Sequence, residues 1–166
     1  MKLQNIVFPP RAALLDELPM YYRSSEMFYY SEIDKCYFLT KKEDVWFDTY
    51  FNAFSLAKWR KYTHIDNLQL SLTLQGNFYV ELRGFSLSRE GIQHAKFFIN
   101  KYSLPSLGTV TLVFPMNDCG IVFFKIRAIS DVKIFSGAFY SDVPEENMND
   151  VNISLVTCTF KREEYL

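Results

Sequence analysis

A strict alternation of apolar and polar residues over residues 68–82 constrains the fold more than any other feature of this sequence. The apolar positions are Leu68, Leu70, Leu72, Leu74, Phe78, Val80 and Leu82. A period of two is that of a β-strand that buries one face and exposes the other. Gly76-Asn77 interrupts the run, and Gly-Asn between two alternating segments is a turn signal. The sequence therefore predicts an antiparallel hairpin with one buried face.

Other segments carry the same signals, and helix formers are scarce. We expect helices only over residues 11–18 and 55–62. Eight to ten short strands with regularly spaced turns are typical of an all-β fold, an antiparallel, jelly-roll-like β-sandwich. The further strands are expected at 26–30 and 35–40 (paired about Ile33-Asp34), 45–54, 95–100, 108–114, 120–128 and, after a short turn at Ser130-Asp131, 131–140.

Composition narrows the possible functions. The 166 residues suit a single domain with a real core, and a net charge of −1 gives no field that would attract nucleic acid. Aromatic residues make up 17% of the chain, which suits both β-strands and sugar-binding platforms. Cys36, Cys119 and Cys158 form no CxxC pair, so we expect free buried thiols in a reducing compartment. With no signal-like or membrane-spanning apolar run, a cytoplasmic location is expected.

The composition changes near the end of the chain. Residues 141–151 are acidic and polar, whereas Val151 to Thr157 form a continuous apolar run of the kind found in a buried parallel strand. The predicted organisation is a β-sandwich over 1–143, a linker over 144–150, and the first strand of a following α/β domain over 151–166. We expect the sequence to be a truncated part of a longer protein.

Several stretches carry a family resemblance. They are "LQNIVFP" (3–9), "MYYRSS" (20–25), "TYFNAFSLAKWRKYT" (49–63), "LQLSLTLQGNFYVELRG" (68–84) and "VTCTFKRE" (156–163). Together they resemble the N-terminal β-sandwich, and the start of the catalytic domain, of galactofuranosyltransferase-type family 2 glycosyltransferases. Members of that family build cell-wall or capsular polysaccharides in bacteria.

The resemblance implies that the catalytic machinery lies downstream of this chain. The family's catalytic domain uses a UDP-sugar, an Asp-rich motif for a divalent metal (Mg or Mn) and an acidic base. This sequence contains no DxD triplet, so we expect no catalytic and no metal-binding residue in it, and whether it is itself an enzyme is left open. By resemblance, Thr159 and Arg162 would line the uridine diphosphate pocket, with Phe160 beside the base. The implied partner is the protein's own catalytic domain, at the inner face of the membrane.

Aromatic residues are the candidates for glycan contact, because the C–H faces of sugars suit flat rings. The candidates are Tyr79, Trp59, Trp46 and Tyr50. Tyr79 stands out because it occupies the polar side of the alternation, where it would form a patch with Asn77 and Glu81. The alternative interpretation of each aromatic residue is that it belongs to the core or to an interface.

Three classes of function follow. The first is a non-catalytic module of a glycosyltransferase that guides the glycan acceptor or acts as a scaffold for the catalytic domain. The second is a free-standing carbohydrate-binding or oligomerisation module, since exposed aromatic surface favours self-association. The third is an independent β-barrel enzyme or lipocalin-like carrier, although no set of residues in the sequence indicates a site for such a function. His64 and His94 are isolated and predict no metal site.

Overall fold

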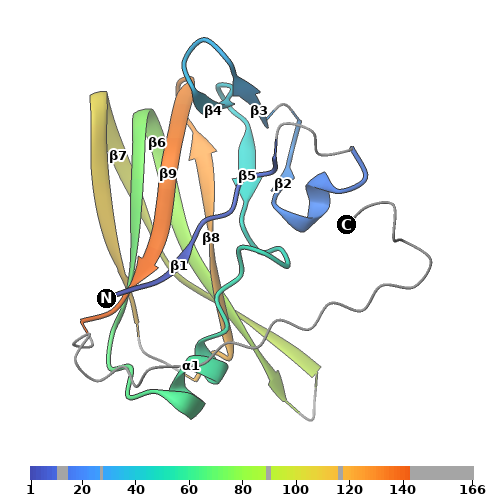
Figure 1. Cartoon of the computed structure of the whole chain (residues 1–166), viewed down its shortest axis with the longest axis vertical. Coiled ribbons are helices and arrows are strands. Elements are labelled where there is room, and N and C mark those ends of the chain that lie inside the picture. Colours follow the sequence, from blue (N-terminus) through green and yellow to red (C-terminus); the bar gives the residue numbers. More distant parts are fainter. Residues whose placement is uncertain (11–14, 27, 89–90, 116–117, 143–166) are drawn as a thin grey trace, which may run out of the picture.

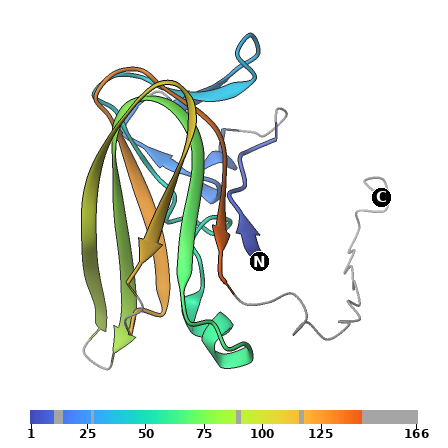
Figure 2. The same ribbon diagram turned by 90° about the vertical axis from the view of Figure 1, so that its left-hand side faces the viewer.

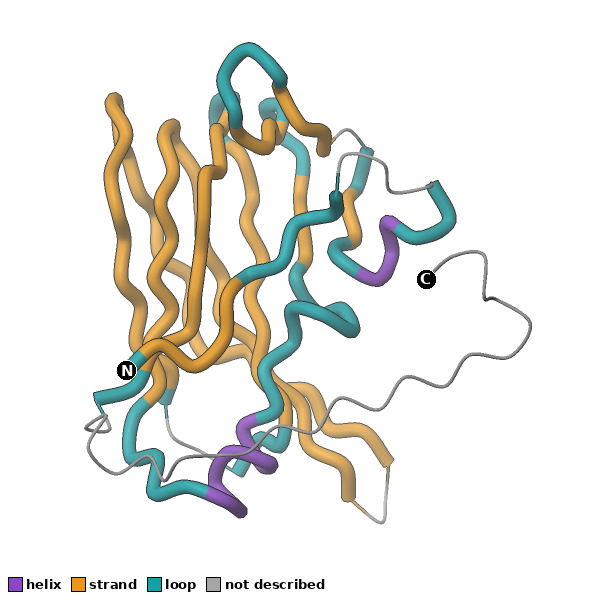
Figure 3. The backbone as a smooth tube through the Cα atoms, in the orientation of Figure 1, coloured by secondary structure: helices purple, strands orange, loops and turns teal. Residues whose placement is uncertain are grey.

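Strands form most of the regular structure of the chain (Figure 3). The computed structural model describes residues 1–10, 15–26, 28–88, 91–115 and 118–142. Nine antiparallel strands within these ranges form one sheet, in the order β2-β5-β8-β6-β9-β4-β3, with β7 beside β6 and β1 beside β9. The predicted all-β class is confirmed. The elements are β1 (Lys2–Asn5), the 3₁₀ turn η1 (Leu18–Met20), β2 (Arg23–Ser24), β3 (Phe28–Ser31), β4 (Cys36–Leu39), β5 (Asp44–Trp46), α1 (Leu56–Tyr62), β6 (Leu68–Ser88), β7 (Gly91–Phe114), β8 (Ile121–Ala128) and β9 (Val132–Tyr140).

Two long strands fold this sheet into a sandwich. β6 has 21 residues and β7 has 24, and they pair from Leu68 opposite Phe114 to Ser88 opposite Gly91. Figure 2 shows both strands bending over the top of the molecule and descending on the other side. The rings of Phe97 and Phe114, both in β7, have centroids 6.3 Å apart. A straight strand rises about 3.3 Å per residue and would put these residues roughly 55 Å apart, so the two halves of β7 face each other across the core.

The predicted hairpin at Gly76-Asn77 is therefore wrong in its pairing. The chain reverses at Gly76-Asn77, but residues 68–75 and 78–88 are two parts of β6 that lie in opposite layers. Each part finds its hydrogen-bond partners elsewhere. β7 takes one edge of β6, while β9 and β8 share the other edge, along Gln69–Gln75 and Phe78–Phe85 respectively.

The bend of β6 fits against the break between β8 and β9. The backbone N–H groups of Ile129 and Ser130 donate to the Asn77 carbonyl at 2.8 and 3.1 Å. The short turn predicted at Ser130-Asp131 lies in this break. Gly76 has φ +125°, and a Cβ atom at this position would lie 2.5 Å from the Asp131 carbonyl oxygen. Glycine is thus required both by the backbone conformation and by the close approach.

The strand predicted over 45–54 is much shorter in the structure. β5 ends at Trp46, and residues 49–53 form turns. The cause is Asn52, which is fully buried. Its Nδ2 donates to the carbonyls of Val7 and Tyr21 at 2.8 and 2.6 Å, and its Oδ1 accepts from the Val7 N–H at 2.7 Å. These bonds satisfy a buried amide and tie the turns to two distant segments, which outweighs the strand propensity of the aromatic residues.

The remaining predicted elements agree with the structure where it describes them, except the helix predicted over 11–18, of which residues 15–17 form a turn and Leu18 begins η1. The β3–β4 pair confirms the hairpin about Ile33-Asp34, and α1 lies within 55–62, at the lower end of the sandwich in Figure 1. The strands predicted at 95–100 and 108–114 are both parts of β7, and those at 120–128 and 131–140 are β8 and β9. The helix predicted over 11–18 lies partly outside the described residues, as do the linker and the whole segment 151–166. The domain boundaries therefore stay predictions.

Stacked aromatic rings fill the space between the layers. Phe47 and Phe124 stack with centroids 4.6 Å apart, and Phe54 and Phe139 are separated by 4.9 Å. All seven apolar residues of the 68–82 alternation are buried, as predicted. Cys36 and Cys119 are buried, as expected, and Cys158 lies outside the described residues. The even-numbered side chains of residues 68–82 thus form part of the core, which leaves the odd-numbered ones for the outer faces.

Candidate functional site

Charged and aromatic side chains gather on the outer face of β5, β8, β6 and β7. The strand registers place these residues in two neighbouring rows, one residue per strand. We call this surface the basic face. The first row is Asp44, Arg127, Tyr79 and Lys101, and the second is Trp46, Lys125, Glu81 and Ile99. Arg83, Lys96, Arg23 and Asp48 flank the rows.

A hollow lies in the middle of the basic face. It is lined by Tyr79, Glu81, Ile99, Lys125 and Arg127, and has an open volume of about 380 Å³. We call it the Tyr79 hollow. Tyr79 and Ile99 give it an apolar part, while the other three side chains are charged. The prediction that Tyr79 lies on the polar side of its strand, near Glu81, is therefore confirmed.

Asn77, the third residue of the predicted patch, lies elsewhere. It lines a separate hollow at the bend of β6, together with Gly76 and Ser130. Its Oδ1 accepts a hydrogen bond from Ser103 Oγ at 2.6 Å. Its side chain therefore helps to fix the bend and is not part of the Tyr79 hollow.

One carboxylate holds the two cations of the hollow. Asp44 accepts from Arg127 Nε at 2.8 Å and from its Nη2 at 3.0 Å, and Lys125 Nζ lies 2.8 Å from Asp44 Oδ2. Burial raises the pKa of Asp44, but the hydrogen bonds from Arg127 and Lys125 more than offset this, and the pKa stays below its ordinary value. The same hydrogen bond from Arg127 raises the pKa of that guanidinium. Asp44 and Arg127 are therefore both charged at neutral pH.

A second carboxylate is shared in the same way. Glu81 Oε1 lies 2.7 Å from Arg83 Nη2 and 3.4 Å from Lys96 Nζ, and the Glu81 side chain is only 10% exposed. Because each of Asp44 and Glu81 is shared by two basic side chains, each of these clusters carries an excess of one positive charge. This excess lies on a chain whose overall net charge is −1.

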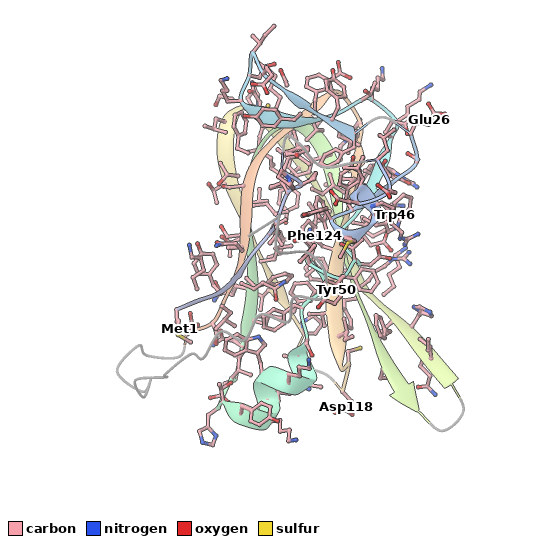
Figure 4. All side chains as sticks on the ribbon, turned by 45° about the vertical axis from the view of Figure 1, so that its right-hand side comes forward. Met1, Glu26, Trp46, Tyr50, Asp118 and Phe124 are labelled. Carbon is pink, nitrogen blue, oxygen red and sulfur yellow. The ribbon has the colours of Figure 1, made fainter. Side chains whose placement is uncertain are left out.

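Trp46 lies beside the hollow, with two cations over its ring. Lys125 Nζ is 4.4 Å and the Arg23 guanidinium carbon 5.5 Å from the ring centroid. Arg23 also forms an ion pair with Asp48. In Figure 4 Trp46 lies at the right-hand side of the ribbon, whereas Phe124 lies further inside. Trp46 and Tyr79 are thus the two predicted glycan contacts that the structure brings onto one face, on either side of Lys125.

The other two predicted contacts lie apart from this face. Trp59 of α1 stacks on Phe54, with centroids 5.9 Å apart and an interplanar angle of 7°, and so packs against the core. Tyr50 is 82% exposed in the turns after β5, where its ring meets that of Phe51 edge-on (Figure 4). The three residues assigned by resemblance to the nucleotide pocket, Thr159, Phe160 and Arg162, lie outside the described residues.

Lys125 and Arg127 were not predicted as site residues. Both interrupt the apolar segment 120–128 at alternate positions, which indicates an outward orientation on β8. Their place beside Tyr79 depends on β8 pairing with β6, a register that this alternation does not specify. The signal for their outward orientation was present, but the signal for their partners was not.

Two further observations concern the described ranges only. No three His, Cys, Asp or Glu side chains gather there in a way that would hold a metal ion. No helix there is long and apolar enough to cross a membrane.

The fold places this chain in the class of antiparallel β-sandwich domains, here with an aromatic and charged outer face. Comparison with protein families identifies it further. The family model described as "Galactofuranosyltransferase 2 N-terminal" matches residues 3–142, and the chain belongs to this family. This confirms the resemblance, over the residues that form the sandwich. No curated protein matches the chain.

Proposed function

We propose that this domain is the glycan-guiding module of a bacterial galactofuranosyltransferase that makes a cell-wall or capsular polysaccharide. In this proposal the domain is not catalytic. The UDP-sugar donor and the divalent metal are handled by the catalytic domain of the full-length enzyme, at the inner face of the membrane. The sandwich holds the acceptor glycan against the basic face.

The Tyr79 hollow is the observation that carries the proposal. An aromatic ring and charged hydrogen-bonding groups converge there on a rigid sheet, within a domain that belongs to a galactofuranosyltransferase family. Sugar rings are bound by this combination, because the C–H face packs on the aromatic ring while the hydroxyl groups exchange hydrogen bonds with charged groups. The strands fix these side chains in position, so little order is lost when a glycan binds.

Trp46 provides a direct measurement. Since the chain has two tryptophans, a Trp59→Phe background leaves Trp46 as the only indole, and phenylalanine retains an aromatic ring against Phe54. We expect an oligosaccharide of galactofuranose to change the Trp46 emission in a saturable way. Tyr79→Ala should weaken this binding, by about tenfold for one lost stacking contact.

Tyr140→Ala is the matched control. Tyr140 is also an exposed tyrosine in a strand, but it lies in β9, beside Gln69 in the other layer. The control should bind like the Trp59→Phe parent. If millimolar oligosaccharide changes neither the Trp46 emission nor the amide shifts around the Tyr79 hollow, the glycan-guiding function is refuted.

A scaffold role is a second candidate, and the opposite outer face favours it. There the paired residues of β7, β6 and β9 are uncharged: Thr109, Thr73 and Ser136, then Thr111, Ser71 and the buried Ala138, then Val113, Gln69 and Tyr140. A surface of this kind buries against another domain at little desolvation cost. In a full-length enzyme, Val113→Lys should weaken the attachment of the sandwich to the catalytic domain, measured as faster proteolysis between them, without changing binding at the Tyr79 hollow.

A further inference from the structure

Three hydrogen-bond donors stand side by side in the first row of the basic face. Arg127, Tyr79 and Lys101 lie directly opposite one another on β8, β6 and β7. Directly paired residues of neighbouring antiparallel strands have Cβ atoms about 5 Å apart and point to the same side of the sheet. The row therefore presents a guanidinium, a phenol hydroxyl and an ammonium to the solvent in one line.

The donor groups of this row are not used up by hydrogen bonds or ion pairs within the described part of the protein. Arg127 uses Nε and Nη2 for Asp44, and its side chain is 57% exposed. Its Nη1, the Tyr79 hydroxyl and Lys101 Nζ have no hydrogen-bond or ion-pair partner among the residues that the structure describes. Asp44 orients the guanidinium so that its remaining N–H groups are held in place. A guanidinium held in this way is suited to a carboxylate or a phosphate.

The charge balance favours an anion over a neutral group. The basic face carries Arg23, Arg83, Lys96, Lys101, Lys125 and Arg127 against Asp44, Asp48 and Glu81. Both acidic groups in the two rows, Asp44 and Glu81, are already neutralised by two cations each. An incoming anion therefore meets excess positive charge and little repulsion.

The apolar part of the hollow indicates which kind of molecule carries the acidic group. Tyr79 and Ile99 lie in neighbouring strands and line the hollow together. A free inorganic anion makes no favourable packing contact with an aromatic ring or an aliphatic side chain, whereas the C–H face of a sugar packs on both. The recognised group is then an acid attached to a sugar ring.

We propose that the Tyr79 hollow binds an acidic sugar residue, with its carboxylate or phosphate on Arg127 and Lys101 and its ring over Tyr79. The inference rests on the proposed glycan-guiding function and names the chemical class of glycan. It predicts that the acceptor, or a substituent along it, carries negative charge.

The experiment compares a neutral sugar with two acidic sugars that share its ring. Galactose, galacturonate and galactose 1-phosphate are titrated into the Trp59→Phe protein, with inorganic phosphate and acetate as anions without a ring. Binding is followed by Trp46 emission and by amide shifts at low and high salt. We expect both acidic sugars to bind at least about tenfold more tightly than galactose at low salt, the value of one charge-assisted hydrogen bond. High salt should reduce this difference.

Lys101→Gln removes one charge without breaking an ion pair, since Lys101 has none among the described residues. It should reduce the preference for the acidic sugars severalfold, and Arg127→Gln should reduce it further. Lys58→Gln, an exposed lysine of α1, is the matched control and should leave the preference unchanged. Because Arg127→Gln also releases Asp44, Lys101→Gln is the decisive variant if Arg127→Gln is unstable.

The outcomes separate this inference from the proposed function. Equal affinity for galactose and the acidic sugars would overturn the anionic site and leave glycan guiding intact. Inorganic phosphate binding as tightly as galactose 1-phosphate would overturn the sugar part of the inference. If neither the acidic sugars nor galactofuranose oligosaccharides bind, the glycan-guiding function and this inference both fail. Tight binding of the acidic sugars alone supports the inference and rejects a neutral acceptor.

Discussion

Replacing Gly76 with alanine tests whether the bend of β6 is fixed by close packing against the break between β8 and β9. With φ at +125°, this position lies in a region that is nearly exclusive to glycine, and an alanine there costs about 1–3 kcal/mol in backbone strain. The added Cβ would also lie 2.5 Å from the Asp131 carbonyl oxygen and 3.1 Å from Val132 Cα. Both atoms belong to the backbone, so relief requires a shift of the bend itself, at about 1–3 kcal/mol. We expect Gly76→Ala to lower the free energy of unfolding by about 4 kcal/mol.

Gly91→Ala is the control that separates the two effects. Gly91 also has a positive φ, +118°, but none of the described residues comes within 4 Å of an added Cβ. It should therefore lose only the backbone contribution of about 1–3 kcal/mol. Urea unfolding followed by circular dichroism measures both losses, and a 4 kcal/mol loss corresponds to a Tm lower by roughly 8–16 °C. If the two variants lose the same stability, the contact with Asp131 does not hold the bend and the reasoning is refuted.

Two further predictions concern buried ionisable groups. Asp44→Asn leaves Lys125, whose side chain is 9% exposed, without its carboxylate, and should cost about 3 kcal/mol at neutral pH. Because the pKa of Asp44 stands below its ordinary 3.8 in the folded chain, its contribution is present above that value and is lost as the pH falls through the folded pKa. Urea unfolding at neutral pH and at roughly pH 3 should therefore show a smaller acid loss for the variant than for the parent. For Tyr37, burial, helped by the neighbouring Tyr22, raises the pKa to about 12, so the parent should lose stability as the pH rises from 10 towards 12. Tyr37→Phe removes the 2.8 Å bond to the Pro9 carbonyl, at a cost of about 1 kcal/mol, and should abolish the tyrosine that ionises last in an absorbance titration.

The alternation in residues 68–82 predicted the buried residues of β6 correctly but not their pairing. In a hairpin with a two-residue turn at Gly76-Asn77, Leu74 would pair with Tyr79 and Leu72 with Glu81. Directly paired residues share a face of the sheet, so such a hairpin would mix buried and exposed residues on both faces. A strand that bends from one layer into the other keeps all seven apolar residues of the alternation inside, as the structure does. Because the apolar residues occupy even-numbered positions on both sides of Gly76-Asn77, the pattern itself favours one bent strand over a two-residue hairpin. The Gly-Asn turn signal nevertheless led to the hairpin prediction.

Two other features depend on partners that are distant in sequence. Asn52 forms turns in place of a strand because Val7 and Tyr21 supply its hydrogen-bond partners, and nothing within 45–54 indicates them. Similarly, the outward position of Tyr79 was predictable from its own strand. The cations beside it come from β8 and β7, whose registers against β6 are set by the tertiary structure.

The bend and the basic face depend on each other. The N–H groups of Ile129 and Ser130 on the Asn77 carbonyl fix the end of β8 beside Asn77, which places Arg127 opposite Tyr79. A slip of one residue in this register would turn Lys125 and Arg127 towards the core and Ile126 outward, at a cost that includes burying two charges. The register is therefore held from both ends, by the glycine that lets β6 approach the break and by the ion pairs that Lys125 and Arg127 form with Asp44 on the outer face. The row of Arg127, Tyr79 and Lys101 is consequently a rigid feature of the fold, which is the condition under which three spaced donors can distinguish an acidic sugar from a neutral one.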